Sequence, residues 1–223
     1  MSIAVLTPSR GRPERLAEMV EAIASTSVGG VAIYVGLDLD DVDYPKRAST
    51  GRVLIIYHRW HRRRLAAWTN YLAEQALADG HSILGFLGDD HRPRTPGWDT
   101  RIIEAMAALG DGLVYADDGL QGERLPTAPF WSAKVIRALG FYYPPVLDHL
   151  FADDYWLRLA HDLGRCTYLP DVSIEHQHPA AGKAEMDRSY EESAACWDHD
   201  ERALRAFLRD EHPAALARVL EAL

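Results

Sequence analysis

The sequence ILGFLGDDH, residues 83–91, places a short apolar run directly before two adjacent carboxylates. Such a run, bounded by turn residues, is typical of a strand buried on both faces of a parallel sheet. Similar runs occupy residues 3–7, 31–37 and 53–58, and helical patterns with one apolar face separate them. This alternation predicts an α/β fold with a mostly parallel central sheet flanked by helices.

The remainder of the chain continues with shorter elements. We expect helices over 99–109, 132–139 and 154–163, and short strands over 113–116, 166–169 and 172–176. The polar stretch 179–200 is weakly patterned and predicts a mobile loop. Residues 201–223 predict a short helical extension, divided at Pro213.

Composition narrows the class of protein. The 223 residues include 33 Asp and Glu against 24 Lys and Arg, a net charge of −9, which argues against a general nucleic-acid or membrane-surface binder. The charge is uneven: residues 44–73 contain no acid, whereas 185–201 contain seven acids and one arginine. Cys166 and Cys196 form no disulfide framework, and neither a signal sequence nor a membrane-spanning run is present, so we expect a cytoplasmic protein.

The first candidate site lies after the run at residues 83–87, because ligands of parallel α/β sheets bind at the carboxyl ends of the strands. Asp89 and Asp90 follow that run, and an apolar strand that delivers two carboxylates into solvent at its end is costly unless a cation lies there. Carboxylate oxygens suit Mg²⁺ or Mn²⁺, which bind diphosphates. An acidic turn before the loop 92–96 is the alternative.

Two other strand ends carry groups that suit a nucleotide. Pro8, Ser9 and Arg10 begin a loop that leads into a helix, where backbone N–H groups and a guanidinium can bind phosphate. Asp38 ends the second run, where its carboxylate can accept hydrogen bonds from a base or ribose. Ordinary surface loops are the alternative at both places.

Two later motifs complete the candidate centre. Asp153 and Asp154 begin an amphipathic helix, where one of them can act as a base or both can serve as an N-terminal cap. His176 and His178 end a short strand two residues apart and therefore point the same way, as a pair of metal ligands would.

Together these segments resemble the GT-A fold glycosyltransferases, especially the inverting family 2 enzymes. The resemblance spans residues 3–178 in the family's order and rests on these segments: IAVLTPSR (3–10), Asp38, Asn70, FLGDD (86–90), PFWSAK (129–134), DDYWL (153–157) and YLPDVSIEH (168–176). It divides the chain into a nucleotide-binding half, 1–91, an acceptor half, 92–178, and the loop and helical extension, 179–223.

The resemblance implies transfer of a sugar from a nucleotide-diphosphate sugar, such as a UDP- or GDP-sugar, to an acceptor hydroxyl. Pro8, Ser9, Arg10, Asp38, Asn70 and Asp89 would bind the donor, and Mn²⁺ or Mg²⁺ would be held by Asp90 with His176 or His178. Asp154 would be the catalytic base, with Asp153 as the other candidate. The sequence does not decide whether transfer inverts or retains the configuration at the anomeric carbon, and it does not identify the acceptor.

Some features depart from the family or allow other functions. Gly88 replaces the first aspartate of the family's metal motif, and Asp153 replaces the glutamate before the base. A nucleotidyltransferase, or a binding protein without catalysis, would use a similar nucleotide domain. The basic, aromatic stretch 59–64 suits either an anionic acceptor such as modified DNA or arginines near the donor diphosphate. The pair Asp117–Asp118 has no assigned role.

Overall fold

A computed structural model describes residues 1–41, 43–44 and 52–223. Lys46 and Arg47, which belong to the basic stretch 44–73, lie outside the described residues. None of the helices in the described ranges combines the length and the apolar character needed to cross a membrane.

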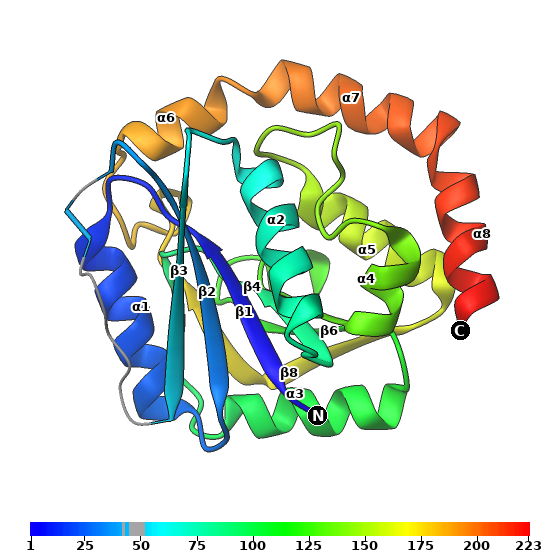
Figure 1. The fold of residues 1–223 in the computed structure, drawn as a ribbon, viewed down its shortest axis with the longest axis horizontal. Helices are drawn as coiled ribbons and strands as arrows, with labels where there is room; N and C mark the ends of the chain where they lie inside the picture. The colour runs from blue at the N-terminus through cyan, green and yellow to red at the C-terminus, as the bar shows by residue number, and fades with distance from the viewer. Residues whose placement is uncertain (42, 45–51) are drawn as a thin grey trace.

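The centre of the fold is one eight-stranded sheet in the order β3-β2-β1-β4-β7-β6-β8-β5 (Figure 1). The strands are β1 (Ile3–Pro8), β2 (Val31–Asp38), β3 (Val53–Trp60), β4 (Ile83–Phe86), β5 (His91–Pro93), β6 (Leu113–Asp117), β7 (Pro129–Ser132) and β8 (Cys166–His176). Strands β1 to β4 pair in parallel, as does β6 with β8, while β7 is antiparallel to both β4 and β6. The predicted mixed α/β, mostly parallel sheet is confirmed.

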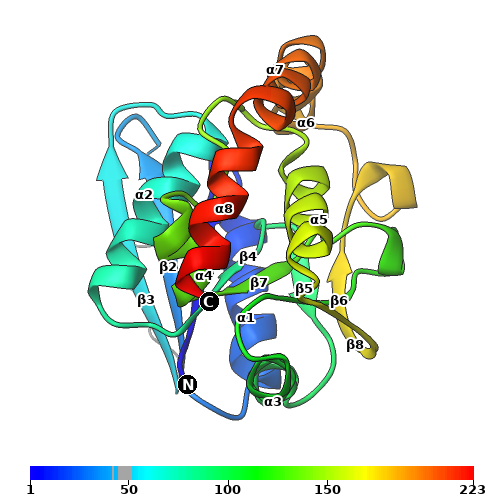
Figure 2. The ribbon, with the colours of Figure 1, turned by 90° about the vertical axis from the view of Figure 1, so that its right-hand side faces the viewer.

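Helices cover both faces of the sheet. The elements are α1 (Pro13–Thr26), α2 (Leu65–Ala78), α3 (Trp98–Leu109), α4 (Ala133–Leu139), α5 (Ala152–Leu163), α6 (Arg188–Ala194), α7 (Trp197–Asp210) and α8 (His212–Ala222). Successive β1 side chains alternate between the faces: Ile3 and Val5 pack with α1 and α3, whereas Ala4 and Leu6 pack with α2, α4 and α5. Figure 2 shows α3 on the opposite side of the sheet from α4 and α8.

The segment 179–200 is more regular than the sequence suggests. A 3₁₀ turn, Pro179–Ala181, is followed by α6 and by the start of α7, where a loop was predicted. The Asp187 side chain begins α6 by accepting hydrogen bonds from the backbone N–H groups of Ser189 and Tyr190. The loop prediction was therefore wrong for residues 188–194 and 197–200, and no apolar periodicity marks α6 in the sequence.

The two short strands expected over 166–169 and 172–176 are one strand, β8. Its register against β6 shifts between Ala116 and Asp117, which pair with Leu169 and Ser173. The residues between these partners bulge out of the ladder, and they include Pro170, which has no N–H to donate. The bulge explains why the sequence pattern breaks inside a continuous strand.

The C-terminal helices are tied to the rest of the fold by a buried carboxylate. Asp200 of α7 is 0% exposed and accepts hydrogen bonds from the backbone N–H groups of Asp148 (3.0 Å), His149 (2.8 Å) and Leu150 (2.8 Å). These three residues directly precede α5, so Asp200 fixes the approach to that helix. Figure 1 shows α6, α7 and α8 running in an arc from the side of α1 to the side of α4.

We predict that Asp200→Ala lowers the free energy of unfolding by about 3 kcal/mol, because three buried N–H groups lose a charged acceptor. Denaturant unfolding monitored by circular dichroism measures the change. Asp198→Ala, which removes an exposed acid from the same helix, is the control and should change stability by less than about 1 kcal/mol. Equal effects of the two variants would contradict the anchoring role.

Candidate active site

A cleft of about 990 Å³ opens at the carboxyl ends of β1, β2 and β4. The loop before α5, the end of β8 and the segment containing α6 form its other walls. The predicted site residues that line it are Pro8, Ser9, Arg10, Asp38, Asp89, Asp90, Asp153, His176 and His178. Asn70 and Asp154 do not belong to the described lining. Residues predicted from segments far apart in the sequence therefore meet in one cavity.

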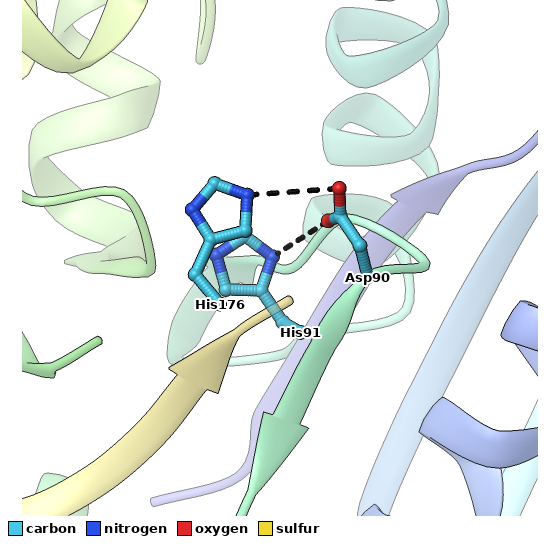
Figure 3. A group of neighbouring side chains, drawn as sticks. All are labelled: Asp90, His91 and His176. Carbon is cyan, nitrogen blue, oxygen red and sulfur yellow. Dashed lines mark ion pairs between the residues drawn. The ribbon is translucent and has the colours of Figure 1, made fainter. Parts of the chain in front are cut away.

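The Asp90 carboxylate faces two stacked histidine rings (Figure 3). Its Oδ1 atom lies 3.3 Å from His91 Nδ1, and its Oδ2 atom lies 3.6 Å from His176 Nε2. The two rings are 4.3 Å apart between centroids and nearly parallel. One ligand atom from each of the three residues lies within 4.8 Å of the others, so the group has the dimensions of a metal site.

Pairing of β5 with β8 creates this group. The two strands are antiparallel, and His91 is directly opposite His176 in their register. His91 was missed in the sequence because three residues of β5 show no strand pattern. His178 lies beyond the end of β8, where its Nδ1 accepts a hydrogen bond from Ala180 N–H. It lines the cleft but lies outside the group of possible metal ligands, which therefore includes His176 and not His178.

The chemistry of the group fits a divalent cation. Asp90 and His91 are buried, and the Nε2 atom of His91 and the Nδ1 atom of His176 have no hydrogen-bond partner. Burial alone would lower the pKa of His176, but the nearby carboxylates of Asp118 and Asp90 raise that pKa to about 9. The surroundings thus favour positive charge at this point. A carboxylate with imidazole nitrogens suits Mn²⁺ better than Mg²⁺, which prefers oxygen ligands.

Gly88, which replaces the family's first metal-motif aspartate, is required by close packing. A Cβ atom at this position would lie 2.6 Å from Asp90 Oδ1 and 3.2 Å from His91 Nδ1. The Gly88 N–H also donates a hydrogen bond to His91 Nδ1 (3.1 Å). A side chain here would therefore displace the carboxylate that faces the histidines.

Asp118 provides support behind His176. One carboxylate oxygen accepts the backbone N–H groups of Leu120, Gln121 and Gly122, and the other accepts the Thr127 hydroxyl. The second oxygen lies 3.9 Å from His176 Nδ1. Although burial opposes the charged form, these contacts hold the pKa of Asp118 well below its usual range. The pair Asp117–Asp118, unassigned from sequence, thus contributes one residue to the site.

Asp89 is buried, with 4% of its surface exposed, and it orients groups at the end of β1. Its carboxylate accepts a hydrogen bond from the Ser9 hydroxyl (2.6 Å) and pairs with Arg12 Nη1 (3.1 Å). Burial and the charge of Asp90 raise the pKa of Asp89 to about 6, although Arg12 and Ser9 oppose that shift. Arg12, absent from the predicted site residues, therefore lies beside both motif aspartates and lines the cleft.

The polar side-chain atoms of Asp38 and Arg10, two of the predicted donor-binding residues, are engaged within the protein. Asp38 is 2% exposed and accepts hydrogen bonds from Arg10, Trp68 Nε1 and the Arg63 N–H. Arg10 also forms a bidentate pair with Asp40.

Asn70 lies away from the cleft. Its amide nitrogen donates to the Tyr143 carbonyl, and its amide oxygen accepts the N–H groups of Tyr142 and Tyr143. This placement does not fit the predicted donor contact, because the whole amide is used to hold the segment that follows α4 against α2. A role in supporting the cleft fits the same contacts.

The two acids at the start of α5 occupy different surroundings. Asp153 lines the cleft and is half-buried, whereas Asp154 is exposed. Burial and the neighbouring charge of Asp154 raise the pKa of Asp153 to about 7. Phe151, just before the helix, has φ of 65°, a conformation that non-glycine residues rarely adopt. That turn sets the rotation of the helix and brings Asp153, rather than Asp154, to the cavity.

The basic, aromatic stretch 59–64 contributes three arginines to the cleft wall: Arg62, Arg63 and Arg64. Arg62 pairs with Glu192 of α6 (3.0 Å), and Arg64 pairs with Asp148 (3.4 Å). The Arg63 guanidinium lies within 6 Å of the ring centres of Trp60, Trp68 and Tyr71. The arginines thus border the same cavity as Asp38 and Arg12.

Known structures share this fold. The S. aureus protein TarS has a TM-score of 0.58 at 11% identity over 100% of this chain and 81% of its own. The Pyrobaculum calidifontis mannosyltransferase PcManGT, in complex with GDP-Man and Mn²⁺, has a TM-score of 0.55 at 13% identity over 99% and 73%. A putative glucose-1-phosphate thymidylyltransferase from Bacillus anthracis, in complex with sucrose, has a TM-score of 0.50 at 11% identity over 85% and 99%.

These similarities confirm that the chain has the GT-A-like fold that the sequence motifs predict. TarS has also been solved in complex with UDP-GlcNAc, and that structure has a TM-score of 0.59 at 11% identity over 86% of this chain and 64% of its own. No protein-family model matches the sequence, and no curated protein matches it. At these identities the comparisons concern the fold.

We predict that Gly88→Ala weakens Mn²⁺ binding in the presence of UDP by about 10–100-fold, since the new methyl group displaces Asp90 from the histidines. Isothermal titration calorimetry measures the affinity. Gly30→Ala is the matched control, because a Cβ there would make only an ordinary contact of 3.9 Å with the Arg52 carbonyl. Unchanged Mn²⁺ affinity in a folded Gly88→Ala variant would show that Asp90 does not hold the metal.

Proposed function

We propose that this chain is a metal-dependent glycosyltransferase that moves a sugar from a nucleotide-diphosphate sugar to an acceptor hydroxyl. The observation that carries the proposal is the placement of three groups in one cleft. Asp90 with His176 forms a cation site, Arg12 lies beside it, and Asp153 faces the same cavity. The GT-A-like fold, shared with a mannosyltransferase bound to GDP-Man and Mn²⁺, supports the same conclusion.

The donor is bound at the ends of β1 and β4. Asp90 and His176 would hold a divalent cation beside the stacked ring of His91, with Mn²⁺ favoured by the imidazole ligand. When bound, that cation would neutralise the charge of the departing diphosphate. Arg12 adds a guanidinium fork that suits phosphate oxygens, and Arg62 and Arg64 also line the cleft. This arrangement favours arginines near the donor over a DNA-binding role for the basic stretch.

Asp153 is the proposed base, in place of Asp154. It takes the proton from the acceptor hydroxyl while that oxygen bonds to the anomeric carbon and the bond from this carbon to the diphosphate oxygen breaks. Attack from the side opposite the diphosphate gives inversion. A pKa of about 7 matches the task, since the group is ionised near neutral pH and still accepts a proton effectively.

We predict that Asp153→Asn lowers kcat by about 10³-fold and leaves donor affinity within about twofold, because the base is lost and the donor contacts remain. Asp154→Asn, the matched control on the same turn, should retain most activity. Transfer is followed by product mass spectrometry, and donor binding by calorimetry. A severe loss of kcat in Asp154→Asn alone would show that Asp154 is the base.

The pH dependence should follow the titration of Asp153. Since the raised pKa keeps this carboxyl protonated under acid conditions, kcat/KM should fall about tenfold per pH unit below about pH 7 and level off above it. Asp154→Asn removes the neighbouring negative charge that raises the pKa of Asp153, so the pH below which kcat/KM falls should be lower in this variant. An unchanged pH profile in Asp154→Asn would contradict the assignment of Asp153 as the base.

A screen of donors tests the function as a whole. Thermal stability is measured with UDP-, GDP- and dTDP-sugars, each with and without Mn²⁺, and each stabilising donor is then assayed for release of its nucleoside diphosphate. We expect stabilisation that requires Mn²⁺ and release of the nucleoside diphosphate. Release of pyrophosphate from a nucleoside triphosphate and a sugar phosphate would instead identify a nucleotidyltransferase, the activity suggested by the B. anthracis neighbour's name.

A further inference from the structure

The segment that contains α6 reaches into the proposed donor site and binds its two central groups. The Asp187 carboxylate forms a bidentate pair with the Arg12 guanidinium, with one oxygen 2.8 Å from Nε and the other 2.6 Å from Nη2. The Tyr190 hydroxyl donates a hydrogen bond to Asp90 Oδ2 (2.9 Å). The Tyr190 ring also lies under Arg12, with the guanidinium carbon 4.3 Å from the ring centre.

Asp187 occupies the edge of Arg12 that a phosphate would use. A guanidinium presents Nε and Nη2 as a fork that binds two oxygens of either a carboxylate or a phosphate. Here the fork is filled by Asp187, while Nη1 faces Asp89 at 3.1 Å. A donor diphosphate and the Asp187 carboxylate carry the same sign of charge, so both cannot occupy this edge together.

Tyr190 competes in the same way for the cation site. Asp90 Oδ2, which accepts the Tyr190 hydroxyl, is the same oxygen that lies 3.6 Å from His176 Nε2. A cation bound between that oxygen and His176 would meet the hydroxyl proton directed at the same oxygen. Arg15 fixes the hydroxyl by donating to it at 2.9 Å. Loading of metal on Asp90 therefore requires Tyr190 to move.

We propose that residues 187–190 are an internal plug, in which Asp187 replaces the donor diphosphate on Arg12 and Tyr190 replaces the cation on Asp90, so that donor and metal must displace α6. The inference rests on the proposed function, because it concerns the same site. The plug differs from a lid that closes on bound donor: it is closed in the empty protein and opens on binding. The acidic charge of 185–201 then has a local purpose, since Asp187 from this segment pairs with the Nε–Nη2 edge of Arg12.

Two conservative changes remove the plug's contacts and preserve its helix. Asp187→Asn removes the charge facing Arg12, while asparagine still caps α6 at Ser189 and Tyr190. Tyr190→Phe removes the hydroxyl and leaves the ring beneath Arg12. Glu191→Gln, which neutralises an exposed acid on the same helix, is the matched control.

The first measurement uses the ligand-free protein. Hydrogen exchange of amides 188–194 should be faster in the Asp187→Asn/Tyr190→Phe double variant than in the wild type, and unchanged in Glu191→Gln. The second is calorimetric titration of UDP, and separately GDP, in the presence of Mn²⁺. We expect the double variant to bind about tenfold more tightly, since fewer molecules are held in the closed state. Addition of UDP and Mn²⁺ to the wild type should also accelerate exchange in α6.

The outcomes separate the plug from the proposed function. Weaker or equal nucleotide affinity in the double variant, or slower exchange in α6 when UDP and Mn²⁺ bind, would overturn the plug and identify a closing lid. If neither UDP nor GDP binds to any variant, the proposed function fails, and ligand-free exchange decides the plug alone. Unchanged exchange in the double variant would then overturn it.

Discussion

Two adjacent carboxylates buried at the end of β4 determine how the rest of the site is built. Asp89 and Asp90 are 4% and 7% exposed, and two charges this close in a poorly solvated place are unstable without compensation. The fold separates their surroundings. Ser9 and Arg12 surround Asp89, whose pKa still rises to about 6, whereas His176 and His91 hold the pKa of Asp90 below its usual range, although burial opposes that shift. One acid orients neighbours, and the other stays charged beside the two histidines.

The sheet brings the compensating groups together from both halves of the chain. The parallel strands β1 to β4 deliver Ser9, Arg12 and the aspartates to one edge of the sheet. Strand β8, which pairs with β5, carries His176 to the same point. Asp118 then fixes the far side of the His176 ring. The C-terminal helices belong to this arrangement as well, because Asp200 fixes the turn that precedes α5 and Asp153. The extension therefore contributes to the site in addition to covering the sheet.

Much of the fold could be predicted because β1, β2 and β4 are almost entirely buried and appear as continuous apolar runs. Asp90, His176 and the pair Asp153–Asp154 could also be predicted as site residues, because they lie at the ends of strands and at the start of a helix. His91 could not be predicted, since β5 has three residues and exists only through pairing with a strand some eighty residues later. The choice of Asp153 over Asp154 depends on the unusual backbone of Phe151. Helix α6 has no apolar face and depends on the Asp187 cap and on contacts with Arg12 and Asp90.

The central claim is that Asp90 and His176 hold a cation on which the diphosphate of a nucleotide sugar is bound. Crystals of the chain grown with UDP and Mn²⁺, measured at the manganese absorption edge, test it most directly. The account predicts one anomalous peak between Asp90 Oδ2 and His176 Nε2, with diphosphate oxygens on the ion and beside Arg12. A peak elsewhere with nucleotide bound, or nucleotide bound in the cleft with no metal at Asp90, would contradict the account.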